Sequence, residues 1–258
     1  MKIRLIPILF FKEGNLVRSE NFDLYQILGD PFVQVERYNA WNVDEIIYIN
    51  ISKSLNYEIK NKIEQPSITF IEVMKKASEK CFSPIVFGGG IKNLNDAKKF
   101  FQNGADKISI NSICLENINI ISEFANTFGS QSIVVSIDVK KEDNFYRIYN
   151  SKTDKFLNIN LFDYIKDVEK KGAGEILLNS VDRDGTGMGY DIDLIKKVNN
   201  IINIPLIPVG GVGKFEDFKD LLNNVELSAV AAGNIFNFTE RSYEKAKIYL
   251  KKNKFNFR

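Results

Sequence analysis

The 258-residue sequence predicts an α/β fold, a single (β/α)8 barrel built from two duplicated half-barrels, on three observations. Eight short apolar segments have the length of strands, and segments with helical spacing lie between them. A Gly-Gly step at Gly89–Gly90 returns at Gly210–Gly211, so the second half repeats the first. With 44% apolar residues and no linker, the chain can bury one large core, and we expect one domain over residues 1–258.

In the first half, apolar runs at residues 4–10 and 46–50 predict the first two strands, with a helix over 31–41 between them. Helical spacing over 68–81 leads to a third strand at 84–88. A helix over 93–102 then precedes the fourth strand at 107–111. The polar stretch 52–66 follows a strand, so we expect it at the C-terminal mouth of the barrel, where barrel chemistry sits.

In the second half, the apolar runs at 132–138, 175–180, 204–209 and 228–233 predict the remaining four strands. Residues 161–171, 214–224 and 242–252 have helical spacing, as the crossovers between parallel strands require. The aromatic and polar stretch 140–156 follows a strand and belongs at the mouth for the same reason.

The two Gly-Gly steps indicate phosphate binding. Each follows an apolar strand and precedes a helical segment, with Asp96 and Asp217 at matching offsets. Glycine lets backbone N–H groups approach an anion closely. The sequence therefore predicts two phosphate cradles that face one mouth.

Composition excludes several functions. The 35 basic and 33 acidic residues nearly balance, so nothing favours a nucleic-acid or membrane partner, and no apolar run reaches the ~18 residues of a membrane span. The first eleven residues lack the length and cleavage site of a signal peptide. Cys81 and Cys114 have neither metal-site nor disulfide spacing, which fits a cytoplasmic protein. We expect no metal and no redox cofactor, with small anions and protein as partners.

The chain contains no histidine, so carboxylates, Lys, Arg or Ser must carry any proton transfer. Asp138 and Asp184 follow predicted strand ends and are the acid–base candidates, although either carboxylate could simply cap a turn. When the halves are superposed, Phe10 falls opposite Asp138. A second carboxylate at that position would be expected of a barrel that runs acid–base chemistry across its mouth.

Seven stretches of this sequence resemble the cyclase subunit of imidazole glycerol phosphate synthase, a family of histidine biosynthesis. These stretches are 29–31, 87–91, 104–111, 128–131, 136–138, 172–178 and 182–186, and the likeness covers nearly the whole chain. The resemblance implies a duplicated (β/α)8 barrel that binds a substrate with a phosphate at each end. It also implies a glutaminase (glutamine amidotransferase) partner whose ammonia passes along the barrel axis.

By position, the resemblance assigns one phosphate to Gly89, Gly90, Asn111 and Ser112, and the other to Gly185, Gly210, Gly211, Gly233 and Asn234. It makes Asp138 catalytic, with Asp184 and Arg18 positioning the substrate; Arg18 replaces the family's lysine. The family's first catalytic aspartate falls on Phe10, its strand-two aspartate on Asn50 and its strand-six threonine on Asn179. Loss of one member of an acid–base pair typically costs a factor of ~10² to 10⁴ in rate.

Arg4, Glu45, Lys107 and Glu175 each stand just before an apolar strand, which places alternating charges at the opposite end of the barrel. Solvated charges at strand entrances are common. In the family the matching positions form a salt-bridged ring at the ammonia entrance, and all four charge types are kept here. Asp106, beside Lys107, is expected to contact the glutaminase.

An intact entrance with an altered mouth indicates a barrel that receives ammonia without performing the original cyclisation. Some relatives with a hydrophobic residue for the first aspartate are associated with amidation of surface-polysaccharide sugars, together with a glutaminase and a sugar amidotransferase. The alternatives are an active cyclase of histidine biosynthesis and another phosphate-binding barrel, such as an isomerase. Phe10 counts against the isomerase, which would need an acidic end to the first strand.

Overall fold

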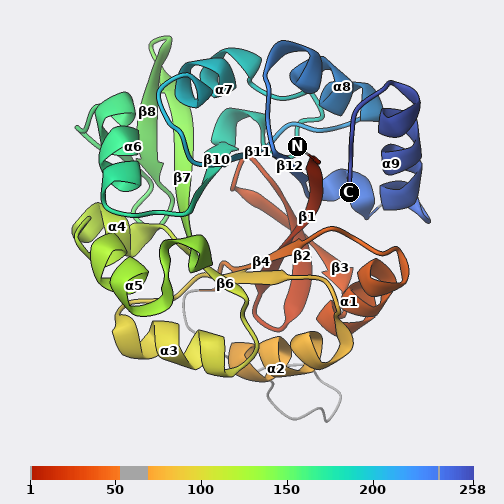
Figure 1. Cartoon of the computed structure of the whole chain (residues 1–258), viewed down its shortest axis with the longest axis horizontal. Helices are drawn as coiled ribbons and strands as arrows, with labels where there is room; N and C mark the ends of the chain where they lie inside the picture. The colour runs from red at the N-terminus through yellow and green to blue at the C-terminus, as the bar shows by residue number, and fades with distance from the viewer. Residues whose placement is uncertain (1, 53–68, 238) are drawn as a thin grey trace.

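The structure of the protein is a computed structural model that describes residues 2–52, 69–237 and 239–258. Within these residues, eight parallel strands form a barrel and helices surround it (Figure 1). The barrel strands are β1 (Arg4–Lys12), β4 (Ile46–Asn50), β5 (Ile85–Gly88), β6 (Lys107–Ile110), β7 (Ile133–Glu142), β10 (Glu175–Ser180), β11 (Leu206–Val209) and β12 (Ala229–Ala232). The predicted (β/α)8 barrel is confirmed.

The strands close into a ring. Parallel ladders connect β11, β10, β7, β6, β5, β4 and β1 in that order, β12 pairs with β1, and β11 lies beside β12. β1 and β7 begin the two halves and have three strands between them in either direction. Residues at the ends of these two strands therefore face each other across the mouth.

The helices begin where the sequence offers capping groups. Pro31 opens α1 (Pro31–Ala40), and Thr69 and Glu72 form a reciprocal capping box at the start of α2 (Phe70–Lys80). The remaining α-helices of the described chain are α3 (Leu94–Gln102), α4 (Ser112–Glu116), α5 (Ile120–Phe128), α6 (Leu161–Lys170), α7 (Ile192–Asn199), α8 (Phe215–Asn224) and α9 (Ser242–Lys252). Short 3₁₀ turns occur at η1 (Ser130–Ser132), η2 (Val181–Arg183) and η3 (Asn234–Phe236).

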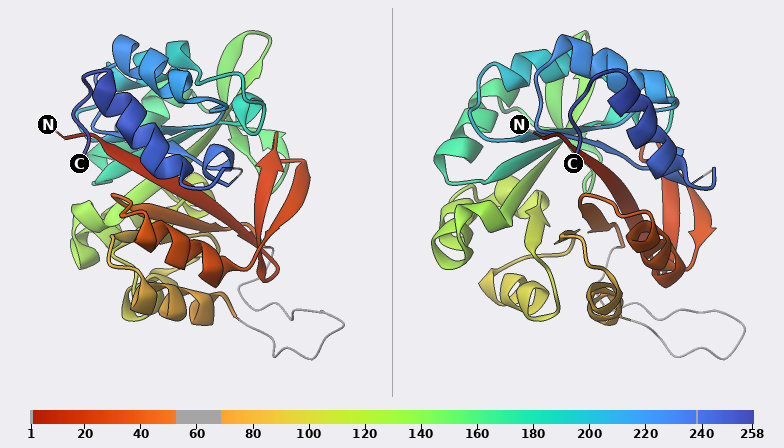
Figure 2. Two further views of the ribbon diagram at one scale, coloured as in Figure 1. Left: turned by 90° about the vertical axis from the view of Figure 1, so that its right-hand side faces the viewer. Right: turned by 45° about the vertical axis from the view of Figure 1, so that its right-hand side comes forward.

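Both halves carry a strand extension after their first strand. β2 (Asn15–Glu20) and β3 (Leu24–Gly29) form a hairpin after β1, while β8 (Phe145–Asn150) pairs with the end of β7 and with β9 (Lys155–Phe156). Figure 2 shows both extensions at the end of the barrel away from the two termini. The expected location of residues 140–156 at the mouth is correct, whereas the hairpin over 15–29 was not predicted from the sequence.

The duplication is visible in local structure. Asp96 Oδ2 accepts the N–H of Lys92 at 3.1 Å, and Asp217 Oδ2 accepts the N–H of Gly213 at 2.8 Å. Each aspartate thus fixes the loop between its glycine step and the following helix. The matching offsets seen in the sequence therefore mark the same turn in both halves.

Successive side chains of each strand point alternately into the barrel and toward the helices, which divides the apolar core into an inner and an outer part. Ile6 and Ile8 of β1 pack inside the barrel, where they form one apolar cluster with other inward-facing residues, whereas Leu5 and Leu9 pack against the helices. The inner cluster also contains Ile47, Val86, Val134, Leu177, Ile207, Val209, Ala229 and Ala231, with Phe10 and Ile49 packed on it. The barrel interior is thus a packed apolar layer between two polar ends.

The predicted polar stretch 52–66 lies outside the described residues apart from Ser52. The structure also adds α4, α5 and α7, which the sequence patterns did not single out. Among the described helices, none combines the length and the apolar character that a membrane span requires.

Candidate active site

Asp138 ends the inward-facing row of β7 and is buried among amide and hydroxyl donors. Its carboxylate accepts hydrogen bonds from Asn111 Nδ2 at 2.9 Å, Asn179 Nδ2 at 3.3 Å and Ser151 Oγ at 3.3 Å. Burial raises the pKa of Asp138 to about 6, and the three donors offset part of that rise because they favour the ionised form. A carboxyl group with such a pKa can exchange a proton near neutral pH.

Asp184 follows η2 and is held by the β2–β3 hairpin. Its Oδ2 accepts a hydrogen bond from Ser19 Oγ, and its backbone carbonyl accepts the N–H of Asn21 at 3.0 Å. Burial raises the pKa of Asp184 to about 6; the bonds from Ser19 and from the N–H of Phe22 lower it, and the charge of Glu20 raises it. The mouth therefore holds two buried carboxylates with raised pKa values.

A pocket at the mouth brings the second predicted phosphate cradle together. Its polar wall consists of Asp184, Gly185, Gly210, Gly211, Gly233 and Asn234, and its apolar wall of Ile8, Phe10, Val209, Val212 and Ala232. Gly210 and Gly211 have φ values of +105° and +97°, and an added Cβ would lie 2.7 Å from the Ser180 carbonyl oxygen and 2.1 Å from that of Gly189. Both positions therefore require glycine, because a side chain would clash with the backbone and the positive φ would be strained.

The first predicted cradle lies around β5. An added Cβ on Gly89, with φ +90°, would stand 1.9 Å from the Asn50 carbonyl oxygen, and Gly90 also has a positive φ of +78°. Asn111 lies on the neighbouring turn, but its amide nitrogen is engaged with Asp138, and Ser112 opens the short α4. The structure thus links this cradle to the catalytic candidate through Asn111.

Two other predicted positions differ in where they point. Phe10 lines the pocket from β1, on the side of the barrel across from β7. Arg18 precedes Ser19 on β2, and because successive side chains of a strand leave opposite faces, Arg18 faces away from the side that binds Asp184. Arg18 and Ser19 therefore leave opposite faces of β2, and the predicted role of Arg18 stays a prediction.

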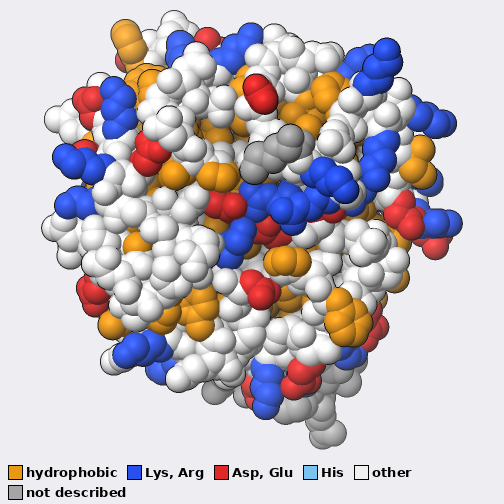
Figure 3. Space-filling model, in the orientation of Figure 1, with side chains coloured by type: hydrophobic (Ala, Val, Ile, Leu, Met, Phe, Trp, Pro, Cys, Tyr) orange, Lys and Arg blue, Asp and Glu red, His pale blue; other side chains and the backbone are white. Residues whose placement is uncertain are grey.

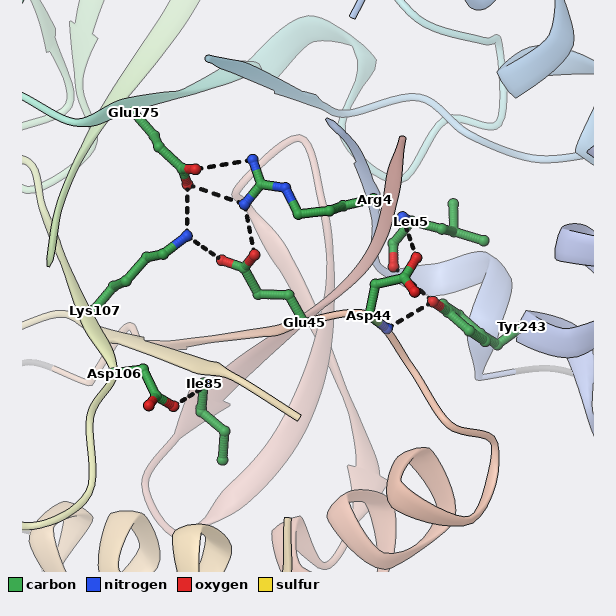
Figure 4. A network of polar contacts seen from close by, with 9 residues as sticks. All are labelled: Arg4, Leu5, Asp44, Glu45, Ile85, Asp106, Lys107, Glu175 and Tyr243. Carbon is green, nitrogen blue, oxygen red and sulfur yellow. Dashed lines mark hydrogen bonds and ion pairs between the residues drawn. The ribbon is translucent and has the colours of Figure 1, made fainter. Parts of the chain in front are cut away.

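At the other end of the barrel, the four predicted charges form a closed ring (Figure 4). Arg4 lies 2.6 Å from Glu45 and 2.9 Å from Glu175, while Lys107 lies 3.0 Å and 3.1 Å from the same two carboxylates. Burial alone would lower the pKa of Arg4, but the charges of Glu45 and Glu175 outweigh it and the pKa is raised. All four side chains are at least four-fifths buried, so the pairs are little screened by solvent.

Asp106 stands next to this ring on the surface. Its Oδ2 accepts the N–H of Ile85 at 2.8 Å, which fixes the start of β5, and the residue stays exposed. Figure 3 shows the same face with a band of Lys and Arg side chains across its middle and acidic side chains beside them. The surroundings of the ring are therefore charged, in contrast to the apolar interior behind it.

Similarity to known proteins agrees with this geometry. A family model described as histidine biosynthesis protein matches residues 4–242. The chain belongs to this family.

Its relatives include imidazole glycerol phosphate synthase subunit HisF of Hydrogenobaculum sp., 40% identical over 256 residues that cover 99% of this chain and 98% of the relative. HisF of Natranaerobius thermophilus is 38% identical over 247 residues, covering 96% and 95%. A Vibrio vulnificus protein provisionally named imidazole glycerol phosphate synthase subunit hisF2 is 37% identical over 258 residues, covering 100% and 92%. The chain is therefore HisF-like over its whole barrel.

Two residues at this HisF-like mouth were not identified from the sequence. Ser19 contacts Asp184 and Ser151 contacts Asp138, while Nδ2 of the predicted phosphate residue Asn234 donates to the Ser19 carbonyl at 3.2 Å. Ser19 and Ser151 both lie in the strand extensions, where no sequence motif marks either serine. In the described residues, no three Cys, Asp or Glu side chains are grouped to hold a metal ion.

Proposed function

We propose that this HisF-like chain receives ammonia from a glutaminase partner at the face that carries the Arg4–Glu45–Lys107–Glu175 ring, and releases it at the mouth beside a small phosphorylated ligand. The closed ring is the observation that carries this proposal. Four buried charges at strand entrances cost desolvation and are weak evidence for stability. Their complete pairing at the barrel entrance favours a role in passage.

A route from the ring to the mouth is supported by the side chains along β7. Val134 lies in the inner apolar cluster, Ser136 follows it on the same face, and Asp138 ends the row. Ser136 is only half-buried although Val135 and Ile137 beside it are buried. A small neutral molecule such as ammonia fits an apolar layer better than ammonium does, because a charge pays a large desolvation penalty there.

We further propose that the chain is a diverged paralogue that passes ammonia to sugar amidation in surface-polysaccharide synthesis, with a sugar amidotransferase as a third protein. Phe10 supports this, because the pocket presents an aromatic ring where the family resemblance predicts a carboxylate. At two other strand ends, Asn50 replaces an aspartate of the family with a neutral amide, and Asn179 replaces a threonine. The full-length similarity to the hisF2 protein of Vibrio vulnificus also fits a second HisF-like lineage.

The alternative is an active cyclase subunit of histidine biosynthesis, a lyase. The pKa values of Asp138 and Asp184 favour it, since both are raised to about 6 and both groups lie at the mouth. The similarity to HisF subunits supports this alternative as well.

Coupling to a glutaminase tests the ring. The protein is co-expressed with each glutaminase subunit of its own genome, and glutamate release is measured with the wild type, Lys107→Met and Glu175→Gln. We expect one glutaminase to be stimulated by the wild type and to lose most of that stimulation with either variant. Lys251→Met, on the exposed side of α9, is the matched control. Equal stimulation by all four proteins would contradict passage through the ring.

A further inference from the structure

The β2–β3 hairpin ends the barrel sheet in an open edge. In the strand order of the described chain, β3 pairs with β2 and with no further strand. Its six residues span about 20 Å, and the backbone N–H and C=O groups on its outer side can pair with another strand. Figure 2 shows this hairpin at the end of the barrel away from the two termini, which is the mouth.

The edge lacks most of the protection that natural proteins give to such strands. Charged side chains and proline usually keep an edge strand from pairing with another chain, and β3 contains neither. A register shift at Leu28 bends only the end of the strand, and Leu24 to Ile27 pair regularly with β2. Leu24 is 66% exposed and Ile27 is 70% exposed. An apolar edge of this kind indicates a surface that another strand covers.

Charges around the edge distinguish a second copy of the chain from a different protein. Exposed carboxylates stand at both ends of β3, Asp23 before it and Asp30 after it. Full-length antiparallel self-pairing would bring Asp23 opposite Asp30 of the second copy, and parallel self-pairing would align each acid with itself. Like charges directly opposite each other destabilise a strand pair. A strand with Lys or Arg at its ends meets the opposite charge in either direction.

The edge alone is too small for a stable complex. Specific interfaces take about 20–30 residues from each protein, whereas β3 offers six. Two further exposed apolar side chains lie at the mouth on the second half of the barrel. Phe145 on β8 is 73% exposed, and Met188 in the loop after η2 is 71% exposed. A partner that reaches from β3 to these residues therefore covers the mouth.

A covered mouth fits the chemistry of ammonia. In water at neutral pH, ammonia is almost entirely protonated, and ammonium has no lone pair with which to attack an electrophile. A protein that accepts ammonia from this chain therefore has to exclude water where the transfer occurs. A tightly docked surface around the mouth provides that exclusion.

We propose that the free edge of β3 is the docking site for the protein that accepts the ammonia, which adds to the sheet an extended apolar segment with Lys or Arg at its ends. This rests on the proposed function, in which ammonia leaves at the mouth. Backbone pairing gives such a contact its affinity. Leu24 and Ile27, on alternate faces of the strand, and the flanking Asp23 and Asp30 give it specificity.

Binding of candidate acceptors tests the edge. Each sugar amidotransferase encoded in the protein's own genome is purified and titrated by calorimetry against the wild type, Ile27→Lys and Asp23→Lys. We expect one of them to bind the wild type. Each substitution should weaken its affinity at least about tenfold, because the first charges the apolar edge and the second repels a basic flank. Ile248→Lys, on α9 and 55% exposed, is the matched control and should bind like the wild type.

Hydrogen exchange separates strand addition from a general contact. In the complex, amide exchange in β3 should slow at least about tenfold, while exchange in α9 stays unchanged. Because Ile27 is mostly exposed, Ile27→Lys should keep the Tm of the wild type, so that its loss of binding reports on the edge and not on folding.

Three results would overturn the proposal. Equal affinity in every variant, or unchanged exchange in β3, would place the docking surface elsewhere. Failure of every amidotransferase to bind would remove the acceptor from this edge. A dimer of the protein alone, seen by sedimentation and dissociated by Ile27→Lys, would show that a second copy covers β3.

The failure of this proposal is distinguishable from that of the proposed function. Stimulation of a glutaminase without docking at β3 leaves passage through the ring standing and refutes the edge site. Docking at β3 without stimulation of any glutaminase refutes the passage and leaves the edge site standing.

Discussion

Replacement of Arg4 by methionine should destabilise the protein strongly. Arg4 lies 2.6 Å and 2.9 Å from the carboxylates of Glu45 and Glu175, whose side chains are only 3% and 10% exposed. The variant leaves two buried carboxylates that share Lys107 alone. Removal of one partner of a buried pair costs roughly 3–5 kcal/mol, because the remaining charge stays buried without compensation. At roughly 2–4 °C per kcal/mol for a chain of about this size, Tm should fall by about 6–20 °C.

Lys107→Met should cost less. Its side chain is 19% exposed, and both carboxylates keep Arg4 as a partner. We expect a loss of roughly 1–2 kcal/mol, within the ordinary range for point substitutions. Comparison of the two variants therefore separates the stability contribution of the buried arginine from that of the more accessible lysine.

Urea unfolding at pH 7, with thermal scans beside it, measures both effects. Exposed Lys251→Met is the control and should change the free energy of unfolding by at most about 0.5 kcal/mol. The double variant Arg4→Met/Glu45→Gln should be less destabilised than the sum of its single variants, because the neutral Gln no longer leaves a second uncompensated charge. A loss below about 1 kcal/mol for Arg4→Met, or strict additivity, would refute the buried ring.

Three further outcomes follow from the mouth. Asp217→Ala should lower the free energy of unfolding in urea by roughly 2–4 kcal/mol, because the N–H groups of Gly213 and Lys214 lose their hydrogen-bond acceptor. Asp96 is more exposed, so Asp96→Ala should cost only about 1 kcal/mol. Equal losses in the two variants would contradict the argument that burial makes Asp217 more important. Gly211→Ala should abolish sulfate binding, because the added Cβ would lie 2.1 Å from the Gly189 carbonyl oxygen. Gly187→Ala is the control, since Gly187 has a similarly positive φ but an added Cβ there would have its nearest neighbour at 3.7 Å. Sulfate binding by Gly211→Ala would exclude this cradle as the phosphate site. Because the folded-state pKa of Asp138 is raised from 3.8 to about 6, protonation of Asp138 favours the folded state, and this stability is lost as pH rises through 6. About 1.4 kcal/mol of the free energy of unfolding should be lost between pH 5 and pH 8 in the wild type and retained in Asp138→Asn. An identical pH dependence of stability in both proteins would argue against the raised pKa.

The sequence predicted the barrel and its charged ring because both depend on local patterns. Apolar runs define the strands, and Arg4, Glu45, Lys107 and Glu175 each precede such a run, so parallel alignment of the strands was enough to bring them to one end. The repeated glycine steps could be interpreted for the same reason. A backbone position with a positive φ favours glycine, so the residue type alone indicates the local conformation.

The contacts across the mouth could not be predicted in this way. Ser19 and Asp184 are 165 residues apart, and nothing in the polar run around Ser19 distinguishes a hydroxyl that holds a carboxylate from one that faces solvent. The orientation of Arg18 depends on the hairpin register, in which Arg18 pairs with Gln26 and Ser19 with Tyr25. A shift of one residue would exchange the two faces, and the sequence alone does not fix that register.

The most direct test of the proposed divergence supplies the purified protein with ammonium salt and the bisphosphate substrate of the histidine pathway, so that no glutaminase is needed. Substrate loss and formation of imidazole glycerol phosphate are followed beside a HisF relative as positive control, with ligand binding measured in parallel. We predict detectable binding without product, because Phe10 stands where the family's first catalytic aspartate is expected. Product formation at a rate comparable to that of the relative would contradict the divergence and establish an active cyclase.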